Sequence, residues 1–111
     1  MQGSTEYIVA ARPLAAFEAL AAVVRDRALP VMRANERHLT IVFRPEGDEP
    51  LTVMCAVLDA GHGLSKLVAT GVDGEDGRIV SVDGYAPRLF ADVERRLREK
   101  AVDRSGSFAR P

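Results

Sequence analysis

The spacing of apolar residues changes along the chain in an order that predicts its fold. A short alternating run over residues 5–10 is followed by apolar residues at helical spacing over 14–28, then by strand-like runs between 31 and 82, and by a second helical stripe from Phe90 to Ala101. Both amphipathic helices can bury their stripes if they cover the same side of a sheet. The sequence therefore predicts an α+β fold, an antiparallel sheet of about five or six strands with two helices on one face, in the order β-α-β-β-β-β(-β)-α.

The first helix has clear boundaries in the sequence. Pro13 suits the first turn of a helix because its missing N–H would have no partner there. Pro30 stops the helix, so its end is expected between residues 26 and 29. The residues expected on its buried side are Leu14, Phe17, Leu20, Ala21, Val24 and Ala28.

A hairpin is expected next, with a short strand over 31–33 and a turn over 34–37. Residues 38–44 then alternate, with Leu39, Ile41 and Phe43 predicted on the helix side and His38, Thr40, Val42 and Arg44 on a more polar side. Residues 45–50 contain the proline, glycine and acidic residues typical of an exposed connection.

The run over residues 51–58 is apolar at nearly every position. A strand of this kind is expected to be covered on both faces, either by its own domain or by another subunit. Glycine-containing reversals at 59–63 and 73–77 then bound two further strands, over 64–72 and 78–82. The double coverage is the strongest indication of an interface in the sequence.

The second helix carries Phe90, Val93, Leu97 and Ala101 as its apolar stripe, widened by Leu89. Three oppositely charged pairs stand one turn apart on its expected solvated face: Asp92 with Arg96, Glu94 with Arg98, and Arg95 with Glu99. Residues 103–111 offer little to bury, so we expect a single domain over residues 4–102 and a flexible C-terminal tail over 103–111.

The order strand, helix, four or five antiparallel strands, helix resembles the TBP-like and helix-grip group of folds, in which a curved sheet wraps a long C-terminal helix. The resemblance covers about residues 5–101 and rests on element order, without a family motif. In larger members, such as the START and Bet v 1 type proteins, it implies an apolar cavity between the sheet and the C-terminal helix that accepts lipids or polyketides. This chain is shorter and lacks the length for their additional strands and helices.

Composition narrows the classes of partner. A chain of 111 residues suits one domain with one core. No apolar stretch approaches the roughly 20 residues that span a bilayer, so a membrane partner is not expected. The formal net charge of -1 gives no global field that would attract a phosphate backbone, which disfavours nucleic acid. The first residues lack the pattern of a secretory signal, so a cytoplasmic location is expected.

Residues that could carry chemistry are few and isolated. His62 lies between two glycines without a partner carboxylate and is expected at a hairpin tip, while His38 lacks metal-ligand spacing. The acidic loop at 73–76 lacks the ligand order of a calcium loop and reads as a solvated turn. Cys55 stands in an apolar run and is expected to be a buried, reduced thiol. The sequence therefore predicts no catalytic residue, no metal and no cofactor.

Two classes of function remain. The first is a non-enzymatic domain that acts by protein association, as a homodimer formed by packing of sheet faces or pairing of sheet edges. The alternative is that the protein binds an apolar small molecule in a pocket between the sheet and the C-terminal helix, or catalyses a cyclase- or isomerase-type reaction on such a molecule there. An enzyme would need a titratable residue on the core side, and none is evident. The residues predicted to line such a pocket, which would otherwise be plain core, are Tyr7, Phe17, Ile41, Phe43, Phe90 and Leu97.

Overall fold

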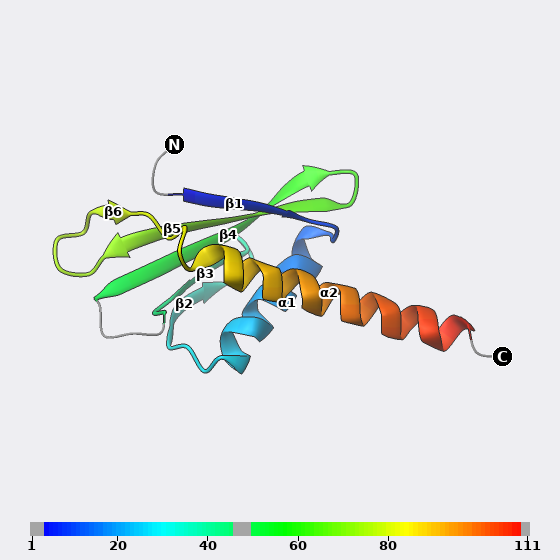
Figure 1. Ribbon diagram of the computed structural model, residues 1–111. Helices are drawn as coiled ribbons and strands as arrows, with labels where there is room; N and C mark the ends of the chain where they lie inside the picture. The colour runs from blue at the N-terminus through cyan, green and yellow to red at the C-terminus, as the bar shows by residue number, and fades with distance from the viewer. Residues whose placement is uncertain (1–3, 46–49, 110–111) are drawn as a thin grey trace.

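A computed structural model describes residues 4–45 and 50–109 of the chain, with side chains described as far as Lys100. It confirms the α+β fold: a six-stranded antiparallel sheet and two helices in the order β-α-β-β-β-β-β-α (Figure 1). The elements are β1 (Ser4–Val9), α1 (Pro13–Asp26), β2 (Val31–Asn35), β3 (Thr40–Phe43), β4 (Leu51–Gly61), β5 (Leu64–Asp73), β6 (Ile79–Val80) and α2 (Ala86–Ala109).

The long hairpin of β4 and β5 forms the middle of the sheet, whose strand order is β1-β5-β4-β3-β2. On its other side, β5 pairs first with β1, through residues 65–70, and then with β6, through Gly71 and Val72. The hairpin turns at His62 and Gly63, whose φ angles of 55° and 77° are both left-handed. Two such residues match the twist of the flanking strands, so His62 lies at a hairpin tip, as predicted.

Both helices lie on the same side of the sheet (Figure 1). Alternate residues of the central strands point toward them and are buried, among them Phe43, Val53, Cys55, Val57 and Leu67. Phe90, Leu89 and Val93 of α2 and Leu20 and Val24 of α1 meet these side chains in one core. The predicted placement of the helices is therefore confirmed.

The buried side of α1 is wider than its stripe predicted. Ala16, Ala19, Ala22 and Val23 are buried as well as Phe17, Leu20 and Val24, because α1 packs against α2 in addition to the sheet. The prediction was wrong for two residues. Leu14 is 49% exposed, and Ala28 adopts a left-handed φ of 56° after the end of the helix, where its N–H donates to the Arg25 carbonyl.

The β2–β3 hairpin turns later than predicted. β2 continues to Asn35, whose side-chain oxygen accepts a hydrogen bond from the His38 N–H. Leu39 has a left-handed φ of 55°, so β3 begins at Thr40 and Leu39 lies in the turn. His38 is likewise an exposed turn residue and not a strand residue. The connection expected over 45–50 falls mostly on residues 46–49, outside the described part of the chain.

The expectation that β4 is covered on both faces is not met within one chain. Val53, Cys55 and Val57 are buried, whereas Met54 is 44% and Leu58 is 50% exposed. The helices cover only the first set, since neighbouring residues of a strand point to opposite faces. The apolar run therefore contributes to the core and also to an uncovered surface.

The last strand is shorter than predicted. A glycine in β5 explains how closely the chain that follows this strand approaches the sheet. β6 comprises only residues 79–80, after which Val82 turns into the core. A Cβ atom at Gly71 would lie 2.6 Å from Val82 Cγ1 and 3.0 Å from the Val80 carbonyl oxygen. Only glycine leaves room there for the chain to cross and lead into α2.

The backbone of α2 is helical to Ala109, beyond the end of its apolar stripe at Ala101. In Figure 1 its C-terminal turns extend past the sheet. The flexibility of residues 103–111 stays a prediction.

Candidate functional site

The side of the sheet that faces away from the helices is the most distinctive surface of the molecule. Of the eight exposed large hydrophobic residues in the described part of the chain, seven lie on strands, and Leu14 of α1 is the exception. Strand register places most of them on the uncovered side. We call this surface the outer sheet face; its apolar residues are Ile8, Met32, Val42, Met54, Ala56, Leu58, Leu64, Val68, Val72 and Ile79.

Cross-strand neighbours make these residues continuous. Met54 lies level with Thr70 of β5 and Val42 of β3, and one step along the strands Ala56 lies level with Val68. At one end Ile79 is level with Val72, and at the other Leu58 is level with Lys66. The result is an apolar area that crosses the sheet from β6 to β3.

Met32 extends this area at the β2 edge. Register shifts between Val31 and Arg33, which leaves Met32 as an extra residue in the strand. Its sulfur lies 3.9 Å from the Thr52 hydroxyl on the outer sheet face, and its side chain is 55% exposed. Methionine adapts to irregular partners because it is flexible and polarizable.

Charged groups on the outer sheet face lie toward its margins. Glu6 on β1 pairs with Lys66 on β5, at 3.4 Å between Oε1 and Nζ. Arg33 on β2 and Arg44 just after β3 are both exposed at the opposite side of the sheet. The middle of the face is thus apolar and threonine-rich, and its two edges carry different charges.

The β2 edge is poorly suited to pairing with another strand. The bulge between Val31 and Arg33 interrupts its row of hydrogen-bonding groups, and bulges and edge charges are common protections against edge pairing. Antiparallel pairing of two copies through the middle of this strand would also bring Arg33 close to the partner's Arg33. The bulge and the exposed Arg33 therefore disfavour pairing of another strand at the β2 edge.

The residues predicted to line a ligand pocket are brought together, but as packed core. Phe17, Ile41, Phe43 and Phe90 are between 0% and 5% exposed in a single cluster, and Tyr7 and Leu97 pack at its margin. Leu97 borders a surface hollow of about 410 Å³ with Ala11 and Ala15, and Phe17 borders a different one. Ligand binding by these six residues stays a prediction.

Tyr7 is the polar member of that set. Its hydroxyl donates a 2.8 Å hydrogen bond to Glu94 Oε1, and its ring centre lies 6.1 Å from that of Phe90. The hydrogen bond to Glu94 and burial raise the pKa of Tyr7, because both favour the neutral phenol. Tyr7 therefore joins β1 to α2, and the structure gives it a clear structural role.

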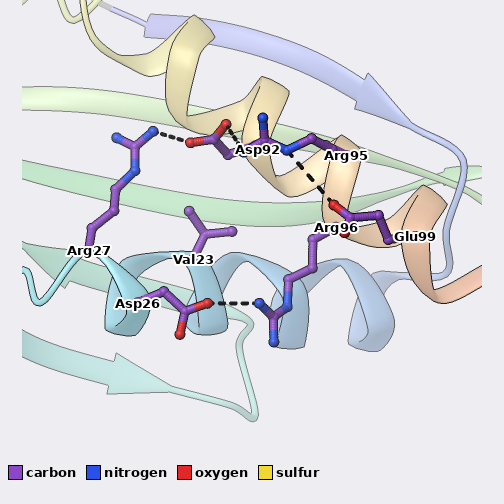
Figure 2. Close-up of a pocket in the computed structure, with 7 residues that line it drawn as sticks. All are labelled: Val23, Asp26, Arg27, Asp92, Arg95, Arg96 and Glu99. Atoms are coloured by element: carbon purple, nitrogen blue, oxygen red, sulfur yellow. Dashed lines mark hydrogen bonds and ion pairs between the residues drawn. The ribbon is translucent and has the colours of Figure 1, made fainter.

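A cluster of ion pairs, which the sequence did not predict, lies between the two helices (Figure 2). Asp92 of α2 accepts hydrogen bonds from Arg27, which follows α1, and from Arg95. Arg96 reaches across to Asp26, at 2.8 Å. The predicted pair of Asp92 with Arg96 is therefore wrong, because both side chains turn toward α1.

The other two predicted pairs on α2 are confirmed, with Glu94 to Arg98 at 3.6 Å and Arg95 to Glu99 at 3.9 Å. Partial burial works to lower the pKa of Arg27, but the hydrogen bond and charge of Asp92 and the Tyr85 hydroxyl outweigh it and raise that pKa. One signal in the sequence could have revealed the cluster. Arg27 stands at the end of the apolar stripe of α1, and Asp92 stands between the stripe residues Phe90 and Val93 of α2, so opposite charges adjoin both buried helix faces.

These charged residues, which we call the interhelical cluster, surround a hollow of about 290 Å³ that Val23 also lines. The cluster consists of Asp26, Arg27, Asp92, Arg95, Arg96 and Glu99. The charged residues that line the hollow are three arginines and three carboxylates, and Figure 2 labels each of them. Because these charges compensate one another, the hollow has no net charge with which to select an ion. The cluster holds the two helices together.

The remaining candidates lie where the sequence predicted. Cys55 is fully buried, and desolvation raises the pKa of its thiol to about 12. His62 is exposed at its turn. In the acidic loop, Asp73 accepts a hydrogen bond from the Glu75 N–H, and Asp76 pairs with Arg78 at 2.7 Å.

Among the residues that the structure describes, no group of three or more histidine, cysteine, aspartate or glutamate side chains is arranged to hold a metal ion. No helix in the same part of the chain is long and apolar enough to cross a membrane.

No protein-family model matches the chain, and no curated protein matches it.

Proposed function

We propose that this protein is a non-enzymatic association module that forms a homodimer by packing its outer sheet face against that of a second copy. The observation that supports the proposal is the gathering of exposed Ile8, Met54, Leu58, Leu64 and Ile79, together with Met32, on the one sheet face that the helices leave uncovered. Contiguous apolar surface of this kind commonly marks an interaction site.

The size of the face suits a stable dimer. Five strands about 4.8 Å apart, with central strands of ten or more residues rising about 3.4 Å each, give a surface of roughly 20 Å by 30 Å. A standard stable interface covers about 800 Å² on each partner. The outer sheet face is thus comparable with what one subunit contributes to such an interface.

The chemistry of the face also suits packing of sheet on sheet. Its threonines can form hydrogen bonds across the interface, while its methionines and branched residues can interdigitate in a layer about 10 Å thick. One ion pair, between Glu6 and Lys66, spans two strands on this face. A symmetric dimer uses the same patch twice, so a mostly apolar patch is compatible with itself.

The test compares two substitutions of equally exposed apolar residues. Met54→Glu places a charge in the middle of the outer sheet face, and Leu14→Glu places one on α1, where the native residues are 44% and 49% exposed. In sedimentation at micromolar concentration we expect wild type and Leu14→Glu to be dimers and Met54→Glu to be a monomer near 12.0 kDa. A wild-type monomer, or a Met54→Glu dimer as stable as wild type, contradicts the proposal.

The helix-grip resemblance suggests the alternative that the protein binds an apolar small molecule beneath α2. Native mass spectrometry distinguishes this alternative from dimerisation. A dimer without added mass supports association. A monomer that carries extra mass supports a ligand site and identifies the ligand by its mass.

A further inference from the structure

We propose that the two copies stack with their strands aligned so that β1 of each lies over β2 of the other, and that Glu6 of each pairs with Arg33 of its partner. This inference rests on the self-association proposed above and adds its geometry and specificity.

The two edges of the outer sheet face differ in charge. The β1 edge carries Glu6, whose side chain remains 58% exposed although it contacts Lys66. The β2 side carries Arg33 on the edge strand and Arg44 just beyond its neighbour β3, both exposed. Glu6, whose charge Lys66 partly compensates, thus stands at one edge of the apolar face, and Arg33 and Arg44 stand at the other.

Symmetry offers two ways to stack such faces. The two-fold axis of a dimer can lie between the sheets and run either along the strands or across them. An axis across the strands places each edge over the same edge of the partner, which brings the arginines of the β2 side together. An axis along the strands places opposite edges over each other. Like charges at an interface oppose binding and opposite charges favour it, so the second arrangement is preferred.

The register shows that the proposed pair is within reach. Glu6 is level with Val68, which is level with Ala56, then Thr40, then Asn35 on β2. Arg33 is two residues from Asn35 and therefore on the same face. Stacked sheets lie about 10 Å apart, a gap that a glutamate and an arginine from facing sheets can bridge together. The pair would occur twice in the dimer.

Charge reversal tests the arrangement. Glu6→Arg and Arg33→Glu are each expected to raise the dimer dissociation constant about tenfold at low salt, since each breaks both copies of the pair. The double variant Glu6→Arg/Arg33→Glu restores the pairs with reversed sign, and its dissociation constant is expected within about threefold of wild type. Arg25→Glu, at an exposed position on α1, is the matched control and should change nothing.

The double variant decides the outcome, because it carries the same Glu6→Arg substitution beside Lys66 as the single variant, so any recovery of binding must come from Arg33→Glu. If the double variant dimerises no more tightly than the single variant with the higher dissociation constant, the proposed stacking is wrong, while the proposal of self-association stands. A wild-type monomer overturns both the stacking and the self-association. Circular dichroism of each variant establishes that a change in mass is not a loss of fold.

Discussion

Cys55 shows how neighbours decide what a single side chain can do. It lies on β4 with no exposed surface, level with Ile41 on one side and Ala69 on the other. Desolvation raises the pKa of the thiol to about 12, so the thiolate needed for nucleophilic chemistry is suppressed near neutral pH. The apolar residues around it in the sequence were sufficient to predict this state.

Burial of Cys55 predicts a loss of stability in alkali. The folded protein keeps the thiol protonated up to about pH 12, whereas an unfolded chain releases the proton above about pH 9.0. The stabilisation is therefore complete below pH 9 and declines as the pH rises toward 12, by up to about 1.4 kcal/mol per pH unit. Urea unfolding at pH 7, 9 and 10.5 measures the decline.

Cys55→Ala provides the comparison for that titration. It should lower the free energy of unfolding at pH 7 by about 1 kcal/mol, through lost packing. Above pH 9 the free energy of unfolding of Cys55→Ala should decline less steeply than that of wild type. Tyr7, whose pKa is also raised, is present in both proteins and cancels in the difference. Equal slopes for the two proteins would argue against the buried thiol as the cause.

Residue-scale predictions from the sequence failed where backbone conformation decided the outcome. Leu39 fits an alternating strand pattern, but its left-handed φ of 55° puts it in the turn that Asn35 and His38 close. Ala28 fits a helical stripe, but the helix has ended there. An apolar side chain indicates burial, and it carries no information about φ.

At the scale of elements, the two helices are joined by more than their apolar stripes. Asp92 and Arg27 are only 27% and 24% exposed in their side chains, and the Arg27 guanidinium donates a hydrogen bond to the Asp92 carboxylate. The helical spacing within α2 predicted local pairs, whereas contact with α1 redirected Asp92 and Arg96 to partners about 65 to 70 positions away. Local spacing cannot predict such partners.

This cluster predicts unequal costs for two similar substitutions on α2. Asp92→Asn removes the charge that compensates Arg27 in a half-buried site and should destabilise the fold by about 1–2 kcal/mol. Glu99→Gln removes an exposed pair with Arg95 and should cost under about 0.5 kcal/mol. Chemical denaturation of the three proteins measures both values, and equal costs would show that the interhelical contact adds no stability.

At the scale of the whole molecule, a six-stranded sheet with both helices on one side leaves its other side to solvent or to a partner. The nearly continuous apolar run of β4 supplies both sides, with Cys55 pointing inward and Met54 outward. The sequence showed β4 to be apolar on both sides, and Met54 and Leu58 are exposed on the second side. A second copy is the partner we propose for it.

A dimer predicts that thermal stability depends on protein concentration. Because association favours the folded state by mass action, the wild-type Tm should rise by about 2–5 °C for a tenfold increase in concentration. The Tm of Met54→Glu should not change with concentration. Calorimetry between about 5 and 500 μM covers the necessary range, and a wild-type Tm independent of concentration would contradict self-association.

The sequence by itself determined the fold class, the order of its elements and most of the core, because helix and strand periods and glycine or proline boundaries are local properties. It also indicated that β4 is apolar on both sides. Tertiary structure decided which of those sides the helices cover, which charges pair between α1 and α2, and that the β1 and β2 edges carry different charges. These depend on contacts between residues far apart in the chain, and only the folded arrangement of strands and helices brings those residues together.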